Sequence, residues 1–561
     1  MRHPVLSAGS LVCALAIGSS LWPSCRGKTA AASQLPAPQS DDRPLGSAPE
    51  RPRVSVVLPR GKTTPMRVLA ANDDLQKTID TAKPGDVIGL EPGVIFSGPF
   101  TLPNKNGNEW VTIRTKIPDG VFPSPGTRVN PSHASLMPII ESSSLSALSA
   151  AAGAHHYRFI GIQIRPRSGA FLYNLVTLGL NEDSVEALPH HITFERCYVH
   201  GDPKVGGRRG IALNSRYTAV VDSYLADFKE QGADSQALAG WNGLGPFAIL
   251  NNYIEGAGEN LLFGGADPSV RNLVPSDIAI VGNRFAKPLA WKIGDPSYAG
   301  VPWTVKNLFE LKNARRVLVD GNVFEYNWPH AQNGFAILFT PRNQDGSAPW
   351  SMVQDVVFSR NIVRHTGSAV NILGTDDNNA SQQVKRISIV GNVFEDIGGP
   401  KWSGAGRLFQ LLSRTADVAI DHNTAFHAGD VIAAEGGPHL GFVCQNNLTP
   451  NNQYGVGGAG TYGHPLQTLS TFFPAALFIK NVLVGGMAQQ YPPNNFFPAT
   501  WAEVGFVDFG GGNYRLLRTS PYKNAGTDHK DVGADIDALD AVTTGALRGQ
   551  LPQEWIGDHS K

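Results

Sequence analysis

The sequence has little charge, little cysteine and, beyond its first residues, no long hydrophobic run. Its 47 basic side chains balance 47 acidic ones, and charged residues make up only 17% of the chain. Nucleic acid is therefore not an expected partner, because phosphate binding needs a basic excess. The absence of a long apolar run excludes a multispan membrane protein. What the sequence does contain is 61 glycines and 40 prolines, which favour an all-β protein with many turns.

The first residues are typical of an export signal. Arg2 and His3 give a short basic start, and residues 5–22 form an apolar stretch. Residues 1–25 are predicted to be a signal peptide, so the protein is expected to be exported, as a secreted or periplasmic protein. Cys25 follows the stretch, where an outer-membrane lipoprotein would carry its lipid; cleavage near residues 30–32 is the alternative. Residues 26–67, rich in proline, alanine and serine, are predicted to be a disordered linker.

Only four cysteines occur, and removal of the signal leaves Cys197 and Cys444, with Cys25 if it is lipidated. The sequence has neither a CxxC motif nor a Cys/His spacing that is typical of zinc sites, so no metal site of that kind is predicted. The repeat described next places Cys197 and Cys444 many coils apart. Two buried free thiols are therefore expected, not a disulfide.

One short pattern recurs from residue 190 onward: alternating apolar residues, then an asparagine, then a further apolar pair. Its copies lie at 191–194, 247–252, 278–283, 317–322, 356–361, 387–392 and 418–423, and looser ones end at Asn447 and Asn481. The aligned residues Asn252, Asn283, Asn322, Asn361, Asn392 and Asn423 are 31, 39, 39, 31 and 31 residues apart. Period-2 strands at this spacing indicate a parallel β-solenoid.

A second apolar strand follows each copy, so each coil is expected to carry at least two strands. These second strands are predicted at 210–213, 260–263, 308–311, 334–339, 369–372 and 408–411. Stacked coils would pair each strand with its counterparts about 4.8 Å above and below, and the inward apolar side chains would form one continuous core. An asparagine at a fixed corner tolerates the left-handed bend and can bond to the asparagine of the next coil.

Both ends of the repeat depart from this rhythm. Residues 73–82 predict a short capped helix, with apolar side chains that can cover the open end of the first coil. Residues 513–536 are expected to close the other end. The β-helix domain is thus predicted over residues 68–540, with a C-terminal tail at 541–561.

Several motifs resemble secreted right-handed β-helix proteins of the pectate-lyase-like superfamily. They are the early helix followed by Lys83-Pro84-Gly85-Asp86, the Gly-Asn-x-Phe coils, and the ending from Ser520-Pro521 to Gly533-Ala534. The N-terminal region is most similar to the family of chondroitinase B and the alginate lyases. The resemblance implies a right-handed parallel β-helix with an N-terminal capping helix, and a polysaccharide as substrate or ligand. The superfamily includes lyases, hydrolases, epimerases and non-enzymes. A monomer is expected, because a capped solenoid needs no partner.

The same resemblance implies candidate catalytic residues. Glu310 and Lys312 share a strand, and Arg342 lies one coil later, as in the chondroitinase B layout. Lys312 would be the base that abstracts the C5 proton of a uronate, and Arg342 would bind the uronate carboxylate. The family holds Ca²⁺ with two acidic residues ahead of this lysine. Here Val305 and Asn307 occupy those positions, so Ca²⁺ is a candidate cofactor without its usual ligands.

A second set of residues has the chemistry of a sugar-binding site. Asp234, Trp241, Asn242 and Glu259 combine an aromatic face with carboxylates and an amide. Trp328 and His330 lie in the long insertions between residues 286 and 355, where indoles could form further subsites. The competing interpretation is that the tryptophans are hydrophobic plugs and that the polar groups satisfy loop amides.

Asp376 and Asp377 are adjacent carboxylates, a feature of β-helix hydrolases, although such a run is also common in turns. Three functions therefore follow from the sequence. The favoured one is an exported polysaccharide lyase acting on an acidic glycan. The alternatives are a non-catalytic surface β-helix that binds glycan or another partner, and a glycoside hydrolase.

Overall fold

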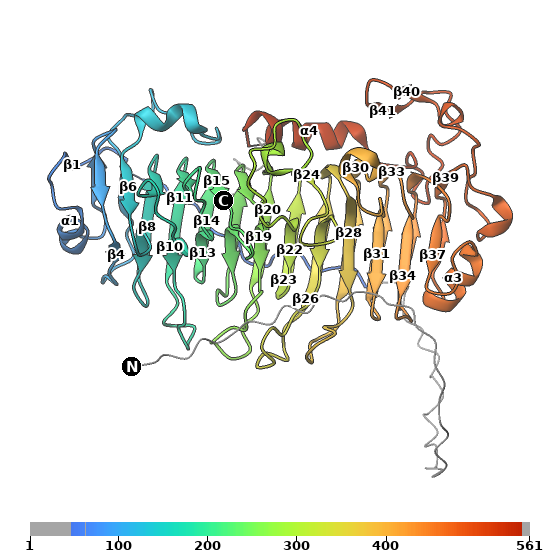
Figure 1. Ribbon diagram of the computed structural model, residues 1–561, viewed down its shortest axis with the longest axis horizontal. Helices are drawn as coiled ribbons and strands as arrows, with labels where there is room; N and C mark the ends of the chain where they lie inside the picture. The colour runs from blue at the N-terminus through green and yellow to red at the C-terminus, as the bar shows by residue number, and fades with distance from the viewer. Residues whose placement is uncertain (1–46, 62, 552–561) are drawn as a thin grey trace, which may run out of the picture. The chain divides into compact units, whose positions relative to one another are not determined.

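The computed structural model describes residues 47–61 and 63–551. The predicted signal peptide, Cys25 and the first part of the predicted linker lie outside these residues. Three long sheets, all parallel, make up the described chain, and their strands follow one another along the stack (Figure 1). No helix in the described ranges is long and apolar enough to cross a membrane.

Each coil contributes one strand to each of three sheets. Sheet A has 14 strands, from β1 (Arg67–Leu69) to β38 (Leu477–Ile479). Sheet B has 13, from β3 (Ile95–Ser97) to β39 (Val482–Val484), and sheet C has 12, from β4 (Phe100–Leu102) to β37 (Val456–Gly458). The predicted all-β fold, a right-handed parallel β-helix, is confirmed.

The strands predicted from the repeat stack in register in sheet A. They are β17 (Phe247–Leu250), β20 (Ser276–Val281), β23 (Ala314–Asp320), β26 (Val353–Ser359), β29 (Lys385–Val390) and β32 (Ala416–Asp421). Phe247 aligns with Ile278, then with Val317, and the register continues to Val418. All these side chains lie in one core cluster, since inward positions repeat every second residue.

The second set of predicted strands forms sheet C. These are β13 (Arg209–Leu213), β19 (Glu259–Phe263), β22 (Asn307–Leu311), β25 (Phe335–Phe339), β28 (Ser368–Leu373) and β31 (Phe409–Leu412). Their alternate residues Leu261, Phe309 and Ile337 point into the core and align across coils. The residues between them, including Glu310, face the loops outside the sheet.

The asparagines form a hydrogen-bonded ladder at the corner between sheets A and B. The side-chain Oδ1 of Asn283 accepts from the backbone N–H of Asn252 at 2.8 Å and from its Nδ2 at 3.0 Å. The same pair of bonds recurs along the stack as far as Asn495, beyond the predicted copies. The predicted asparagine stack is therefore confirmed.

Cys197 and Cys444 are both free and buried, as predicted. Burial raises the pKa of the Cys197 thiol to about 12 and that of Cys444 well above its usual range. Both side chains serve as small apolar groups in the core.

At the N-terminal end, helix α1 (Leu75–Thr81) begins after Asp74, whose side chain accepts from the backbone N–H of Lys77. Leu75 and Ile79 of this helix are buried in the main core cluster. The described part of the predicted linker packs on sheet A. The backbone N–H groups of Glu50 and Arg53 donate to Asp355 at 3.1 Å and Asp277 at 2.8 Å.

The C-terminal segment does not close the stack. Residues before it do so, where the buried ring of Tyr491 stacks on Phe478 of the last strand in sheet A. The chain then turns through an antiparallel pair, β40 (Phe506–Asp508) and β41 (Asn513–Leu516), and returns alongside the coils. It ends in α4 (Ile536–Arg548), which lies along the middle of the stack (Figure 1). Val542 of this helix packs beside Gly321.

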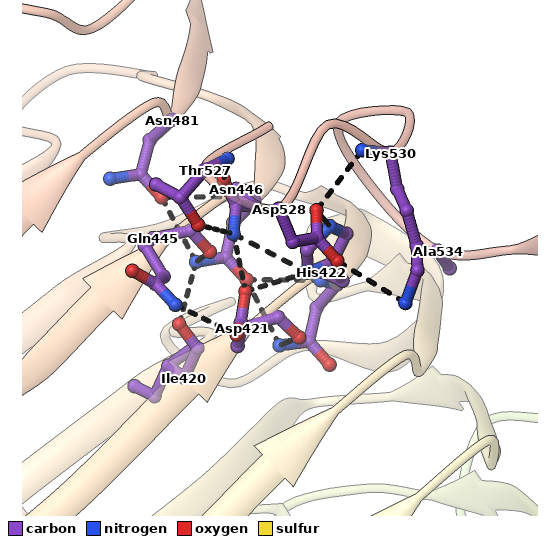
Figure 2. Close-up of polar contacts among 12 residues, drawn as sticks. Ile420, Asp421, His422, Gln445, Asn446, Asn481, Thr527, Asp528, Lys530 and Ala534 are labelled. Atoms are coloured by element: carbon purple, nitrogen blue, oxygen red, sulfur yellow. Dashed lines mark hydrogen bonds and ion pairs between the residues drawn. The ribbon is translucent and has the colours of Figure 1, made fainter. Parts of the chain in front are cut away.

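Polar contacts hold the returning segment to the corner of a late coil (Figure 2). Asn446 and Thr527 exchange two hydrogen bonds of 2.8 and 2.9 Å. His422 lies between Asp421, at 2.7 Å from Nδ1, and Asp528, at 3.3 Å from Nε2. These contacts use the polar groups of the corner to dock the segment.

Candidate functional site

Four polar residues lie in register across four consecutive coils of sheet C. They are Arg209, Gln236, Glu259 and Asn307, which we call the polar row. Each begins or nearly begins its strand: β13, β16 (Gln236–Gly240), β19 and β22. The strand starts sit where loops fold over the sheet, so Gln236, Glu259 and Asn307 are almost fully buried.

Hydrogen bonds connect one half of the polar row. The Nε of Arg209 donates to the Oε1 of Gln236 at 3.0 Å, and the Nε2 of Gln236 donates to the Oε2 of Glu259 at 2.7 Å. The other Glu259 oxygen, Oε1, has no hydrogen-bond partner, and neither does the Oδ1 of Asn307. A ligand that donates hydrogen bonds could satisfy these two acceptors, which lie in neighbouring coils.

Two lysines flank the row. The Nζ of Lys306 pairs with Asp234 and lies 3.7 Å from Glu259 Oε1. The Nζ of Lys312 lies 3.6 Å from the Oε1 of Glu310. The lysine side chains are 18% and 16% exposed. The ammonium groups therefore lie between solvent and the buried carboxylates.

Glycines leave room beside Lys312. Gly264 and Gly265 have φ of 96° and 84°, in the left-handed region that favours glycine. A Cβ on Gly264 would lie 2.8 Å from the Cβ of Lys312. A side chain there would displace the lysine from its place against the sheet.

The electrostatics of the row centre on Glu259. Burial raises the pKa of its carboxyl group to about 7, and the nearby charge of Asp234 adds to the effect. Burial works to lower the pKa of Lys306, but the carboxylates of Glu259 and Asp234 outweigh it and raise that pKa above its ordinary value. At neutral pH the site thus holds a firmly charged lysine beside a carboxyl group that is partly protonated.

Glu310 is held from two coils. Its Oε2 accepts from Asn307 Nδ2 at 3.0 Å, and its Oε1 accepts from the hydroxyl of Thr340 at 3.1 Å. Glu310 is only 2% exposed. It can orient Lys312, but both of its oxygens are already held, by Asn307 and by Thr340.

Arg342 lies next to Lys312 through the backbone, because its N–H donates to the Lys312 carbonyl at 2.9 Å. Its guanidinium, however, is directed to the following coil, where it pairs with Asp376 and with Asp377 at 2.6 Å. Burial raises the pKa of Asp377, but Arg342 outweighs it and lowers that pKa below its ordinary value. The structure therefore joins these two aspartates to Arg342, and leaves Glu310 and Lys312 as a separate pair.

Two further predicted residues follow β16. The ring of Trp241 lies under the guanidinium of Arg209, 5.1 Å from its centre, so it borders the polar row. Asn242 has no exposed surface. Its amide donates to the Glu182 carbonyl at 2.8 Å and accepts from the Val270 N–H at 3.0 Å, so it ties two loops together.

Of the two predicted residues in the long insertions, one is buried and one is exposed near the polar row. Trp328 is buried in a cluster with Trp291, Trp303 and Val305, so these indoles plug the insertion against the sheet. His330 is exposed, and its Nδ1 accepts from the Val305 N–H at 3.3 Å. It lies close to Gln332, whose Oε1 accepts from Asn307.

Sequence reasoning missed Lys306 and Arg209. Lys306 immediately precedes Asn307, and the repeat places it on the same outer edge as Glu259. An alignment of the coils contains a signal for the polar row. The first residue of each of these sheet C strands is polar, from Arg209 to Asn307, whereas the residues just before them, at 208, 235, 258 and 306, are not all polar.

The oxygen atoms of Glu259, Asn307 and Glu310 are the donor type that Ca²⁺ prefers. The Lys306 ammonium nevertheless lies 3.7 Å from the unpartnered oxygen of Glu259 and already supplies a positive charge there. Neither acidic ligand of the family is present, since residues 305 and 307 are valine and asparagine. These residues do not fit a calcium site of the family type.

A groove of about 730 Å³ lies elsewhere, between the returning C-terminal segment and the coils. It carries Arg515, Lys523 and Lys530, but these side chains pair with aspartates of the same segment. The polar row, by contrast, has buried acceptors that lack partners.

No protein-family model and no curated protein matches the chain. Solved structures of similar architecture include an alginate lyase from Paenibacillus sp. str. FPU-7, at 13% identity and a TM-score of 0.35, over 59% of this chain and 98% of that one. The pectate lyase Pel9A matches at 13% identity and 0.33, over 84% and 96%. The alginate lyase AlyGC matches at 12% identity and 0.38, over 87% of this chain and 58% of that one.

Similarity at such low sequence identity bears on the fold alone. The fold itself is defined by the sheets of this chain. Three parallel sheets, one strand of each per coil, enclose a single apolar core. By its architecture the chain is a parallel β-helix.

Proposed function

We propose that the protein is an exported polysaccharide lyase that cleaves a uronate-containing glycan by β-elimination at the polar row. One observation carries the proposal: Lys306 and Lys312 flank buried carboxyl and amide groups of which two oxygens, on Glu259 and Asn307, have no hydrogen-bond partner. Cations, a base and unsatisfied acceptors in one place are what an acidic sugar requires. Export rests on the predicted signal in residues 1–25.

The elimination requires neutralisation of the carboxylate, removal of the C5 proton and protonation of the leaving oxygen. Lys306, with a raised pKa, neutralises the uronate carboxylate, which acidifies the C5 proton. Lys312, oriented by Glu310, accepts that proton. As the C4–O bond breaks and the C4–C5 double bond forms, the leaving oxygen takes a proton from Glu259, whose carboxyl group is partly protonated near neutral pH.

The remaining groups bind and position the sugar. Asn307 Oδ1 accepts from a hydroxyl group, and the Trp241 ring offers an apolar face at the edge of the row. Arg342, which the sequence assigned to the carboxylate, is a positioning residue in this arrangement. Its backbone N–H holds the Lys312 carbonyl while its guanidinium is occupied by Asp376 and Asp377.

The test is the ultraviolet absorbance of the unsaturated uronate product during incubation with alginate, pectate or glycosaminoglycans. Lys312→Ala is expected to lower the rate by about 100-fold or more, the usual contribution of a positioned base. Lys77→Ala, an exposed lysine on α1, is the matched control and should leave the rate unchanged. Because Lys306 already supplies the positive charge, EDTA should not abolish activity. Full activity in Lys312→Ala would overturn the assignment of the base.

A hydrolase is the second candidate, because a buried carboxyl group with a pKa near 7 is also suited to protonate a glycosidic oxygen. New reducing ends without ultraviolet absorbance would support it. Binding of an acidic glycan with neither product would instead support a non-catalytic glycan-binding protein.

A further inference from the structure

Four histidines gather on sheet A, near the N-terminal end of the stack and away from the polar row of sheet C. His155 and His156 begin β8 (His155–Ile160), and His190 and His191 begin β11 (His190–Glu195). Because β8 and β11 are neighbours, His155 aligns with His190. The rings stack across the coils, with centres 4.7 Å apart for His155 and His190 and 4.5 Å for His156 and His191. We call these residues the histidine quartet.

Within each coil the two rings meet at their nitrogens. The Nδ1 atoms of His155 and His156 are 2.7 Å apart, and those of His190 and His191 are also 2.7 Å apart. Adjacent residues of a strand normally point to opposite faces. Here His156 and His191 have φ of 58° and 53°, and this left-handed backbone turns each pair to the same side. The same strand position is left-handed in other coils of sheet A, as at Tyr217 and Asp277, so this turn is a feature of the coil itself.

The surroundings keep the rings uncharged. Burial lowers the pKa of His190 to about 3 and that of His191 to about 4, and the neighbouring histidines and Arg216 add to the effect. The pKa values of His155 and His156 are lowered as well, mainly by burial. In each pair the 2.7 Å contact needs a proton on one Nδ1, and a metal ion bound between the rings would replace that proton.

We propose that the histidine quartet binds a divalent transition-metal ion of the zinc and copper class, with His155, His156 and His190 as ligands. One ligand nitrogen from each of these three residues lies within 4.8 Å of the others. Bonds of about 2.0–2.1 Å place two ligands of a tetrahedral metal about 3.3 Å apart. The Nδ1 atoms of His155 and His156 are 2.7 Å apart, closer than this, and the whole set spans no more than 4.8 Å, so rotations of the half-buried rings would bring three nitrogens to one ion.

The chemistry of the quartet selects the ion. Imidazole nitrogens suit zinc, copper and nickel, whereas Ca²⁺ takes oxygen ligands. Stacked coils supply the ligands from two strands, so the ion would join neighbouring coils. The proposal is independent of the lyase assignment, since the quartet and the polar row share no residue. A Cys/His spacing in the sequence could not predict this site, because its ligands come from two coils and meet only when the coils stack.

The experiment is titration calorimetry of the full chain, without a polyhistidine tag, with Zn²⁺ in the presence of excess Ca²⁺. One equivalent of Zn²⁺ is expected to bind. The variant His155→Phe/His190→Phe keeps the stacked rings but removes two ligand nitrogens, and it should weaken binding at least tenfold. His464→Ala, an exposed histidine before α3 (Pro465–Phe472), is the matched control and should bind as the wild type does.

A second readout uses Trp110, whose ring centre is 5.2 Å from that of His156. Cu²⁺ bound at the quartet should quench its fluorescence, and Trp110→Phe should remove the quenched component. If the double phenylalanine variant fails to fold, His156→Gln tests the same loss. No Zn²⁺ binding by the wild type, or equal binding by His155→Phe/His190→Phe, would show that the quartet is only a stacked structural ladder.

Discussion

At the scale of single residues, Glu259 makes the stability of the protein depend on pH. An ordinary glutamate has a pKa of 4.5, and burial raises that of Glu259 to about 7. Between these values the folded chain holds a proton that the unfolded chain has lost. The free energy of unfolding therefore falls as pH rises through this window, by about 3 kcal/mol at most, and stays lower above it.

The variant Glu259→Gln should remove this dependence, because an amide does not titrate. We expect the melting temperature of the wild type to fall more than that of Glu259→Gln between about pH 5 and about pH 8. Thermal unfolding monitored by circular dichroism measures both slopes. Glu186→Gln, which changes an exposed side chain, should keep the wild-type slope. Parallel slopes for wild type and Glu259→Gln would mean that the buried carboxyl group is ionised throughout.

At the scale of elements, the asparagine ladder ties each coil to the next. Asn322 accepts from the backbone N–H and the Nδ2 of Asn283, and its own Nδ2 donates to the Ile280 carbonyl and to Asn361. All these groups are buried. A buried polar group that loses its partner costs about 1–3 kcal/mol, so the ladder is most sensitive in its interior.

Asn322→Ala is expected to lower the free energy of unfolding by about 3–5 kcal/mol, because it leaves several buried groups unpaired at once. Asn495→Ala provides the comparison. It removes the same two acceptor bonds at the end of the ladder, where Asn495 is partly exposed and water can replace them. Denaturant unfolding of the two variants should give a clearly smaller loss for Asn495→Ala. Equal losses would show that the ladder contributes no more inside the stack than at its end.

The elements also show what the sequence could predict. Alternating apolar residues and evenly spaced asparagines depend only on neighbouring coils, so they predicted the strands, their register and the ladder. Their spacing of two residues also predicted that Glu310 and Lys312 lie together, as they do, although Lys312 lies just after the end of β22. Long insertions and corners could not be predicted in this way. They decide that Trp328 is a plug, that Arg342 turns to Asp376, and that Lys306 covers Glu259.

At the scale of the whole molecule, the core is one continuous stack in which each coil contacts its neighbours. In such repeat proteins the end coils lose their contacts on one side and open with less free energy than the middle. Cys444 in β35 (Val443–Gln445) has only β38 beyond it in sheet A. Cys197 follows β11, the fifth strand of that sheet, with four strands on its N-terminal side. The two thiols therefore report on the end and on the interior of the stack.

Neither thiol should react with a thiol reagent in the native protein, because Cys197 is fully buried and Cys444 is 3% exposed. In full denaturant both should react. At intermediate denaturant we expect Cys444 to be labelled before Cys197, since opening of the last coils exposes it first. Mass spectrometry of the labelled peptides distinguishes the two sites, and Cys444→Ser should abolish the early label. Simultaneous labelling would mean that the C-terminal segment, docked at Asn446 and Thr527 and returning to α4, joins the last coils and the middle into one cooperative unit.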